Sequence, residues 1–480
     1  MWPRQAYGSL SPHRRNSHTM VQTPGQSSGP GENASMPETK ALASWVVKSR
    51  WEDIPDDVRR ESLRAILNYV GCALGGAPDT AVNSAICAFA PFFGPPAARI
   101  LGRRERSDPL HAALMNGISS HVYDYDDTTP KNYIHPSSPV ASALFAYASA
   151  NPVSGRDFVH AFLLGFEAES RIGNSVYPAH YDVGWHITGT AGVFGAAVAI
   201  GKLIGLNEQQ MIWAIGLAAT QAAGLREMFG SMAKSLHPGR AAQNGYAAAL
   251  LAQAGFTAGE HGLEGPRGFA AVQASDYDLS KITANLGVDW DLRANTYKPF
   301  PCGIVNHPAI DGAIQIHNEY HPSPDSIRAV RLRVAPLVLD LCNQQNITRG
   351  LQGKFSVYHG AAVGLVRGKA GIREYTDEAV LDPAIKRVRE SATAAGDPSI
   401  TEDQAEIEVT LGSGEKLTRF VEKSLGNIHR PMTDAQLEQK FREQAVLALS
   451  PSQVDRIIDL CWRIGQLPDV NQLIKEACAD

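Results

Sequence analysis

A mainly α-helical fold is the class that this sequence predicts, with a large all-helical domain and a smaller α+β domain. Apolar residues recur at helical spacing through most of the chain up to about residue 290. Strand-like alternation begins only after about residue 292, and helical periodicity returns near the C-terminal end. A chain of 480 residues is also too long for one hydrophobic core. We therefore predict a disordered tail over 1–36, the helical domain over 37–292, the α+β domain over 293–425, and C-terminal helices over 426–480 that complete the helical domain.

The N-terminal tail differs in composition from the rest of the chain. It is rich in Ser, Pro, Gly and Gln and poor in branched apolar residues, which predicts disorder. It has no acidic residue before Glu32 and carries Arg4, Arg14 and Arg15, as a mitochondrial transit peptide would, although it lacks a good amphipathic helix. An apolar secretory core is missing. We expect an intracellular protein, either cytoplasmic or mitochondrial.

The helical pattern is clearest in ESLRAILNYVGCALGG, where Leu63, Ile66, Leu67 and Val70 recur at helix spacing and a glycine pair ends the run. Several of the later stretches are rich in Ala and Gly, so the helices that they form can approach one another closely. Further helices are predicted over 108–122, 138–150, 155–171, 187–204, 207–225 and 240–255.

One of these stretches is long and apolar enough to raise the question of a membrane span. Residues 187–206, ITGTAGVFGAAVAIGKLIGL, consist mostly of Ala and Gly and contain threonines and Lys202. A buried helix that packs through small residues explains this composition better, so we predict no transmembrane segment.

The α+β domain is predicted from alternating patterns. IRAVRLRV (327–334) and AEIEVTL (405–411) alternate as half-buried strands do, and GSG then turns the chain into KLTRFVEK to make a hairpin. The C-terminal stretches TDAQLEQKFREQAVLAL and SPSQVDRIIDLCWRI are helical again, and the first begins with a TxxQ capping box. Two helices are expected between the strands, over 357–370 and 376–390.

Charge and cysteine usage exclude several classes of function. The net charge of −5 argues against a nucleic-acid or anionic-membrane surface. The six cysteines lie far apart with no CxxC pair, which is typical of reduced thiols and not of a disulfide framework or a zinc site. They also lack the clustered spacing of an iron–sulfur centre. We expect no metal and no cofactor.

The segment DYDDTTPKNYIH concentrates three carboxylates, Asp124, Asp126 and Asp127, just before His135. One interpretation is a solvated turn, because Asp, Thr, Pro and Asn are common turn residues, and Asp126 and Asp127 would then simply cap a helix end. The other is a site that moves protons near neutral pH. As an exposed loop, the segment should tolerate substitution without loss of stability.

Two further stretches place basic residues before small-residue helices. GWHITGTAG has His186 at a helix start, which favours an anion, although a lone histidine there is more often a cap or a satisfied polar group. MAKSLHPGRAAQNG carries Lys234, His237 and Arg240, whose charges could also lie on the surface.

Two stretches in the second half of the chain complete the candidates. YKPFPCGIVNHPAIDGA holds Lys298, Cys302 and His307; it could be only a rigid crossing, and we expect Cys302 to be a small buried hydrophobic residue. GKFSVYHGAA carries Tyr358, and we expect its Lys354 and His359 at the surface. Together the histidines and lysines of all four stretches would suit a pocket for a small polyanion.

The order of these motifs closely resembles the MmgE/PrpD family of 2-methylcitrate dehydratases and cis-aconitate decarboxylases. The resemblance covers about residues 38–475 and implies a helical domain made from both ends of the chain, an α+β lid domain, a cleft between them and a homodimer. The Ala/Gly-rich helices also favour a dimer. Carried over by residue, the pocket of the decarboxylases corresponds to Asp124, Thr128, His135, His186, Lys234, Lys298 and Tyr358.

The resemblance predicts a lyase that dehydrates a citrate-like tricarboxylate, 2-methylcitrate or a longer 2-alkylcitrate, without a metal. Lys234, Lys298 and His237 would hold carboxylates, and His135 or Asp124 would remove a proton. His186 or Tyr358 would protonate the leaving hydroxyl. Decarboxylation of cis-aconitate to itaconate and epimerisation of a dicarboxylate are alternatives, because all three reactions pass through a carbanion-like species. A binding protein without catalysis is a further alternative. The loop before His135 and the stretch around Lys298 differ from those of the vertebrate decarboxylases.

Overall fold

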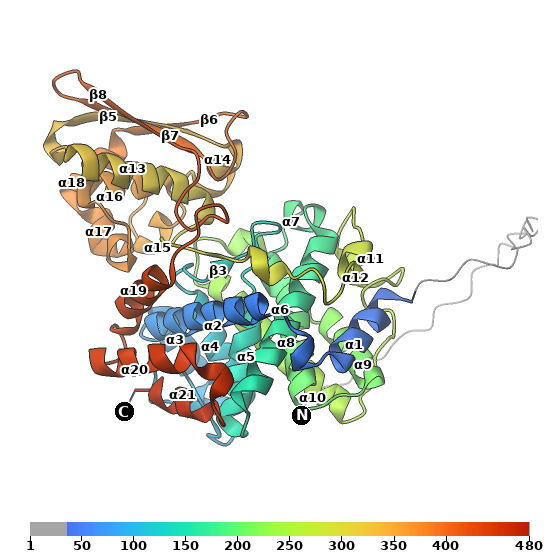
Figure 1. Ribbon diagram of the computed structural model, residues 1–480. Coiled ribbons are helices and arrows are strands. Elements are labelled where there is room, and N and C mark those ends of the chain that lie inside the picture. Colours follow the sequence, from blue (N-terminus) through green and yellow to red (C-terminus); the bar gives the residue numbers. More distant parts are fainter. Residues whose placement is uncertain (1–35, 480) are drawn as a thin grey trace, which may run out of the picture. The chain divides into compact units, whose positions relative to one another are not determined.

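Helices make up most of the computed structural model, which describes residues 36–479 (Figure 1). A mainly α fold with a small mixed sheet is therefore confirmed. The predicted N-terminal tail, apart from Met36, lies outside the described residues. The buried apolar side chains form two large clusters. One lies in the helices that precede and follow the sheet in the sequence, and the other lies around the sheet. The predicted domain boundaries follow this division but remain a prediction.

The first core is built from long helices and the C-terminal helices pack against it. Helix α19 lies against α2, where the Phe441 ring contacts the backbone at Gly71. Thr433 and Gln436 form the predicted capping box. The helices are α1 (Glu38–Lys48), α2 (Asp56–Gly76), α3 (Thr80–Phe89), α4 (Pro109–His121), α5 (Ser137–Ala150), α6 (Gly155–Val176), α7 (Ala179–Asp182), α8 (Ile187–Leu203), α9 (Glu208–Ala219), α10 (Ala233–Gln253), α11 (Phe269–Gln273), α12 (Ser280–Thr283), α19 (Asp434–Ala445), α20 (Pro451–Trp462) and α21 (Asn471–Glu476).

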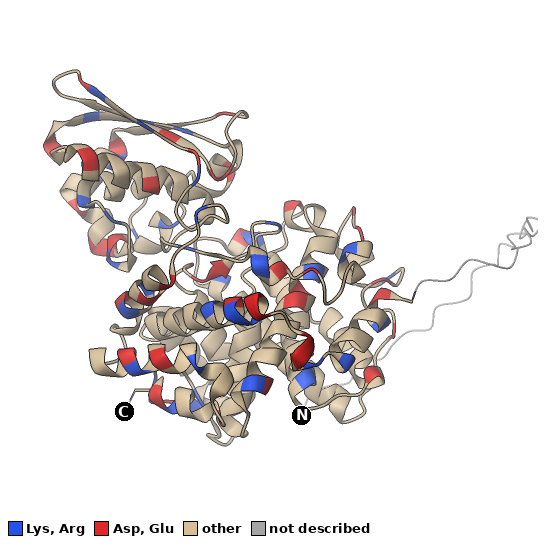
Figure 2. Ribbon diagram, in the orientation of Figure 1, with Lys and Arg blue, Asp and Glu red and all other residues tan. Residues whose placement is uncertain are grey.

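The apolar stretch over 187–206 forms α8, which is buried along almost its whole length. Figure 2 shows charges of both signs interspersed along the elements, whereas α5 and α8 in the middle of the helical part are nearly free of charged residues. In the described part of the chain, no helix is long and apolar enough to span a bilayer.

Glycines allow α4 and α10 to cross in close contact. A Cβ atom added to Gly117 would lie 2.5 Å from the Cα of Gly239, so only glycine fits on either side of this crossing. His121 follows Gly117 by about one helical turn, and Lys234 precedes Gly239 by a similar distance along α10. The Ala/Gly-rich composition thus sets how closely the two helices that carry these side chains approach.

We expect Gly117→Ala to destabilise the protein by about 1–3 kcal/mol or more, because the added methyl group overpacks a backbone contact that cannot yield. Urea unfolding measures the change. Gly465→Ala is the matched control, since a Cβ atom at Gly465 meets nothing within 4 Å. Equal stability of the two variants would show that the crossing is not tightly packed.

The sheet of the second core has the strand order β6-β5-β7-β8. Strands β5 and β7 coincide with the predicted ranges, and β7 and β8 form the predicted hairpin. Helices α13, α16 and α18 contact these strands (Figure 1). The elements are β5 (Ile327–Val334), β6 (Ala392–Gly396), β7 (Ala405–Leu411), β8 (Lys416–Val421), α13 (His307–Tyr320), α14 (Pro336–Cys342), α15 (Gly350–Gly353), α16 (Val357–Arg367), α17 (Asp377–Leu381) and α18 (Pro383–Glu390).

Three details differ from the sequence prediction. Strand β6 was missed because ATAAG has only one residue that favours strands, Thr393, among alanines and a glycine; it is held by parallel pairing with β5. The helix predicted over 376–390 is divided at Asp382 and Pro383, where Asp382 caps a new helix. Helix α10 begins at Ala233, seven residues before the predicted start at 240, so Lys234 and His237 lie on the helix itself.

Two short antiparallel ladders complete the structure. Strand β1 (Ala98–Arg99) pairs with β2 (Arg106–Ser107), and β3 (Asp127–Thr128) pairs with β4 (Thr296–Tyr297). The β3–β4 pair matters for function because it joins two segments that are far apart in the sequence, each of which carries candidate site residues.

Candidate functional site

Asp124 forms the centre of a buried charge cluster. Its Oδ1 atom lies 2.6 Å from Lys298 Nζ and 2.8 Å from Lys234 Nζ. All three side chains are buried. Lys298 reaches this position because β4, which ends at Tyr297, pairs with β3 in the acidic segment. Lys234 reaches it from the first turn of α10.

The charge on Asp124 is fixed by these lysines. Burial alone would raise its pKa, but the ammonium groups of Lys234 and Lys298 outweigh burial and hold the pKa well below its usual value. Burial lowers the pKa of Lys234, and Asp124 opposes that effect. The backbone of Asp124 has a φ of 52°, the left-handed conformation that Asp tolerates better than most residues. One carboxylate therefore serves two ammonium groups, which leaves the cluster with a net positive charge.

His135 lies beside this cluster as a neutral imidazole. Its Nδ1 is 2.9 Å from the Asp127 carbonyl oxygen, which can only accept, so Nδ1 carries the proton. Its Nε2 is 3.8 Å from Asp124 Oδ1. Burial, followed by the positive charge of Lys298, lowers the pKa of His135 well below its ordinary value. The free electron pair on Nε2 makes His135 a suitable proton acceptor.

His186 stands at the N-terminus of α8, and its Nδ1 is 2.8 Å from Nδ1 of His237. Burial lowers the pKa of His186 well below its usual value and that of His237 to about 4, so one neutral imidazole donates to the other. His237 is half-buried and touches His186; it is not one of the residues that line the cavity described below.

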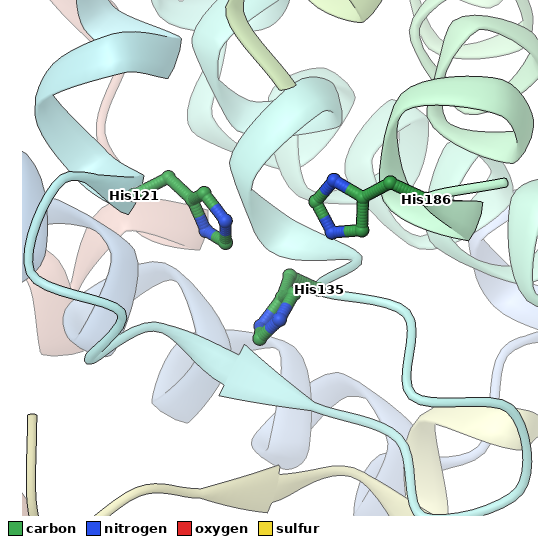
Figure 3. Close-up of side chains that lie close together, drawn as sticks. All are labelled: His121, His135 and His186. Atoms are coloured by element: carbon green, nitrogen blue, oxygen red, sulfur yellow. The ribbon is translucent and has the colours of Figure 1, made fainter. Parts of the chain in front are cut away.

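His121 is a site residue that sequence reasoning missed. Its Nδ1 donates to Asp126 Oδ2 at 2.8 Å, and its buried Nε2 has no hydrogen-bond partner among the residues that the structure describes. Its ring centroid is 4.7 Å from that of His135 and 5.8 Å from that of His186, and Figure 3 shows the three rings converging. The sequence feature that could have identified it is its position at the end of a predicted helix, three residues before Asp124.

The cluster borders two adjoining cavities. The smaller has a volume of about 50 Å³, room for a few water molecules. The larger has a volume of about 580 Å³ and shares Asp124, Lys234 and Phe355 with the smaller one. A bound ligand of several carbon atoms would extend into both. The smaller cavity is lined by Asp124, Thr128, Tyr133, His135, Tyr181, His186, Phe229, Lys234, Lys298, Gly303, Ile304, Val305, Leu341, Cys342 and Phe355.

The structure brings together six of the eight predicted site residues on the wall of the smaller cavity: Asp124, Thr128, His135, His186, Lys234 and Lys298. His237 contacts His186 from outside. Tyr358 is buried, and its hydroxyl group donates to Asn343 Oδ1 at 2.7 Å and accepts from Gln345 at 3.1 Å; it does not line this cavity.

Several alternatives from the sequence are now decided by burial. Asp124, Asp126, Asp127 and His135 are all at most 6% exposed, so the alternative of a solvated turn is wrong. Asp127 instead accepts from the hydroxyl group of Ser137 at 2.5 Å, at the start of α5, and burial raises its pKa to about 7.

The expected surface positions of Lys354 and His359 are also wrong. Lys354 is 4% exposed, and His359 is fully buried, where its Nε2 donates to the carbonyl oxygen of Glu374 at 2.9 Å. Arg240 is exposed, as one alternative expected. Cys302 is fully buried, which confirms the predicted small buried residue, and burial raises its pKa to about 12.

The residues of the site could also be considered as metal ligands. The ring nitrogens of His121, His135 and His186 lie within 4.8 Å of one another, and three histidines are a familiar zinc ligand set. Lys234 and Lys298 already neutralise Asp124 and would repel a cation in the same cavity. The balance of charge in the site favours an anion.

Comparison with known proteins shows the family of this chain. The MmgE/PrpD N-terminal domain matches residues 40–281 and the MmgE/PrpD C-terminal domain matches residues 300–464. Cis-aconitate decarboxylase of Aspergillus terreus is 26% identical over 92% of this chain and 96% of its own length. The Mus musculus cis-aconitate decarboxylase is 25% identical over 91% of this chain and 92% of its own. The 2-methylcitrate dehydratase of Cupriavidus necator is 23% identical over 85% of this chain and 92% of its own length. The chain belongs to the MmgE/PrpD family.

Proposed function

We propose that this protein is a lyase that removes water from a citrate-like tricarboxylate such as 2-methylcitrate or a longer 2-alkylcitrate. The observation that carries the proposal is the buried Asp124, which binds Lys234 and Lys298 beside the neutral His135. Net positive charge on buried side chains at the wall of a cavity selects a polyanion, and a neutral imidazole next to it can remove a proton from carbon.

In the proposed reaction, Nε2 of His135 takes the proton from the carbon next to a carboxylate. Lys234 and Lys298 hold carboxylates and stabilise the negative charge of the enolate-like intermediate. The C–O bond then breaks, the double bond forms, and the hydroxyl group leaves as water with a proton from the imidazolium form of His186, whose partner is His237. His186 is neutral in the free enzyme, and the carboxylates of the bound substrate favour its protonated form because they raise its pKa. Tyr358, which does not line the smaller cavity, is the weaker candidate for this acid.

The names of the relatives favour a second candidate, the decarboxylation of cis-aconitate. The same lysines would hold the substrate, the bond to one carboxylate would break to release carbon dioxide, and a histidine would protonate the carbon. Epimerisation of a dicarboxylate would use the same carbanion-like species. Incubation with 2-methylcitrate and with cis-aconitate separately, followed by mass spectrometry, distinguishes loss of water from loss of carbon dioxide.

A non-enzymatic binding role is the outcome that would overturn the proposal. It would be supported by tight binding of citrate analogues without turnover of any of them. We also propose a homodimer, and light scattering that gives the mass of a monomer at micromolar concentration would contradict it.

Metal independence is part of the proposal, and chelation tests it. Treatment with EDTA is expected to leave kcat unchanged, because the two lysines supply the positive charge that a metal ion would otherwise provide. Metal analysis of the purified enzyme accompanies the assay. A loss of activity that an added divalent ion restores would place a metal on His121, His135 and His186 instead.

The acid side of the pH profile is expected to reflect the lowered pKa of His135. The base must be neutral, and its pKa in the free enzyme lies well below 6.5. After correction for ionisation of the substrate, kcat/KM should therefore stay constant as the pH falls through 6.5 and decrease only at lower pH. Bound carboxylates raise the pKa of His135, so kcat should decrease at a higher pH than kcat/KM. A kcat/KM limb centred at the ordinary histidine pKa would contradict the assignment.

A further inference from the structure

Lys354, directly after α15, is a buried lysine without a carboxylate partner. It is 4% exposed, and no aspartate or glutamate of residues 36–479 lies within ion-pair distance of its ammonium group. Its one hydrogen bond is to the Tyr123 carbonyl oxygen at 2.6 Å, and Nζ lies 4.7 Å from the centre of the Tyr123 ring. Lysine is almost never buried in this way without a pairing anion.

Lys354 supports the loop that carries Asp124, but this structural role explains only part of its burial. Three lysines donate to three successive carbonyl oxygens of the loop that carries Asp124: Lys354 to Tyr123, Lys298 to Asp124 and Lys440 to Tyr125. Lys440 has a second acceptor, Asn68 Oδ1 at 2.7 Å, and lines neither cavity of the site. It is a purely structural lysine. Lys354 uses one of its three N–H donors and lines the larger cavity.

The charge of the expected ligand supplies the missing partner. Lys234 and Lys298 share Asp124, so that cluster offers the ligand a net charge of about one positive unit. A tricarboxylate brings up to three negative charges. The larger cavity begins at the same Asp124 and Lys234 and contains Lys354 on its wall. A further cation is therefore present where a ligand held by the lysine pair would extend.

We propose that Lys354 is a carboxylate-binding residue of the larger cavity, which receives one carboxylate of a tricarboxylate whose others lie at Lys234 and Lys298. The assignment rests on the proposed function and specifies how the substrate class is selected: a dicarboxylate pairs only with Lys234 and Lys298, whereas a tricarboxylate also pairs with Lys354.

Binding at Lys354 should be linked to proton uptake. Burial lowers the pKa of Lys354 to about 7, so much of the free enzyme holds it as a neutral amine above that pH. A bound carboxylate raises this pKa, and the complex takes up a proton. Affinity for a tricarboxylate should therefore decrease as the pH rises above about 7. The titratable groups that border the same cavity or influence this pKa are Asp79, His121, Tyr123, Asp124, Lys234, Cys302, Arg349, Tyr375 and Asp377.

Calorimetry with two unreactive probes tests the inference. Tricarballylate and glutarate have the same carbon chain and differ by one carboxylate. Lys354→Met is expected to weaken tricarballylate binding by about tenfold or more, the value of a charge-assisted hydrogen bond, and to leave glutarate binding unchanged. Lys354→Arg should retain most of the affinity. Lys440→Met, the matched control, should leave the ratio of the two affinities as it is in the wild type.

The wild-type protein provides a test that needs no variant. Calorimetry in buffers of different ionisation enthalpy at about pH 8, above the value of about 7 for Lys354, should show proton uptake with tricarballylate but not with glutarate. Tricarballylate binding that is unchanged in Lys354→Met, or weakened equally with glutarate, would overturn the inference and leave the proposed function standing. If the wild-type protein binds neither probe, both are overturned.

Discussion

His135→Ala is expected to lower kcat by about two to four orders of magnitude, the usual contribution of general acid–base catalysis. Nε2 of His135 is the neutral acceptor nearest to Asp124, and no other imidazole in the smaller cavity has its Nδ1 proton held by a backbone carbonyl group. Asp124→Asn should have an effect of similar size. It removes the charge that holds Lys234 and Lys298 in place while keeping the side-chain shape and tolerating the left-handed backbone.

These variants should also lose stability, contrary to what the sequence suggested. His135 and Asp124 are buried, so removal of the imidazole leaves a cavity and removal of the carboxylate leaves two ammonium groups without an anion. The melting temperature must be measured for each variant, and kcat compared below the temperature at which the weaker one unfolds.

Asp127→Asn is the control within the same segment. Its carboxylate binds Ser137 and Asn295 and does not line the smaller cavity, so we expect a milder effect on kcat. The assignment fails if a folded His135→Ala variant turns over substrate within a few-fold of the wild type while a Lys298 variant does not. The chemistry would then depend on the lysines alone.

Lys298→Met should strongly reduce kcat/KM for a tricarboxylate, by about a hundredfold or more, because it removes a carboxylate-binding charge and unpairs Asp124. Breaking one partner of a buried ion pair typically costs about 3–5 kcal/mol of stability. Here Lys234 still pairs Asp124 at 2.8 Å, so the loss should lie at or below the lower end of that range. Steady-state kinetics and urea unfolding give the two quantities.

The double variant Lys298→Met with Asp124→Asn separates stability from function. Asp124→Asn alone leaves two buried ammonium groups without an anion, whereas the double variant leaves only one. Stability should therefore partly recover. Activity should not recover, because the substrate loses its contact with Lys298 and Lys234 loses the anion that positions it. Recovery of activity with stability would mean that Lys298 only supports the fold.

Strands β5, β7 and β8 and most helices could be predicted from local patterns. The alternation in IRAVRLRV and AEIEVTL and the capping box at Thr433 are properties of short segments, and the structure reproduces them. The motifs also identified six of the residues that line the smaller cavity: Asp124, Thr128, His135, His186, Lys234 and Lys298. Strand β6 could not be predicted, because only its partner β5 makes ATAAG a strand.

What the sequence by itself determined was the fold class, the residue types of the site and the small-residue helices that allow close packing. Burial was decided by tertiary structure alone. An acidic, turn-like segment is predicted to be exposed, but the pairing of β4 with β3 covers it. Burial also lowers the pKa values of His135 and Lys354, and these lowered values suit their proposed roles. The partnership of Asp124 with Lys234 and Lys298 joins residues more than a hundred positions apart. Only the crossing of α4 with α10 and the β3–β4 ladder bring those charges within hydrogen-bond distance, because local sequence carries no information about which distant groups will share one low-dielectric space.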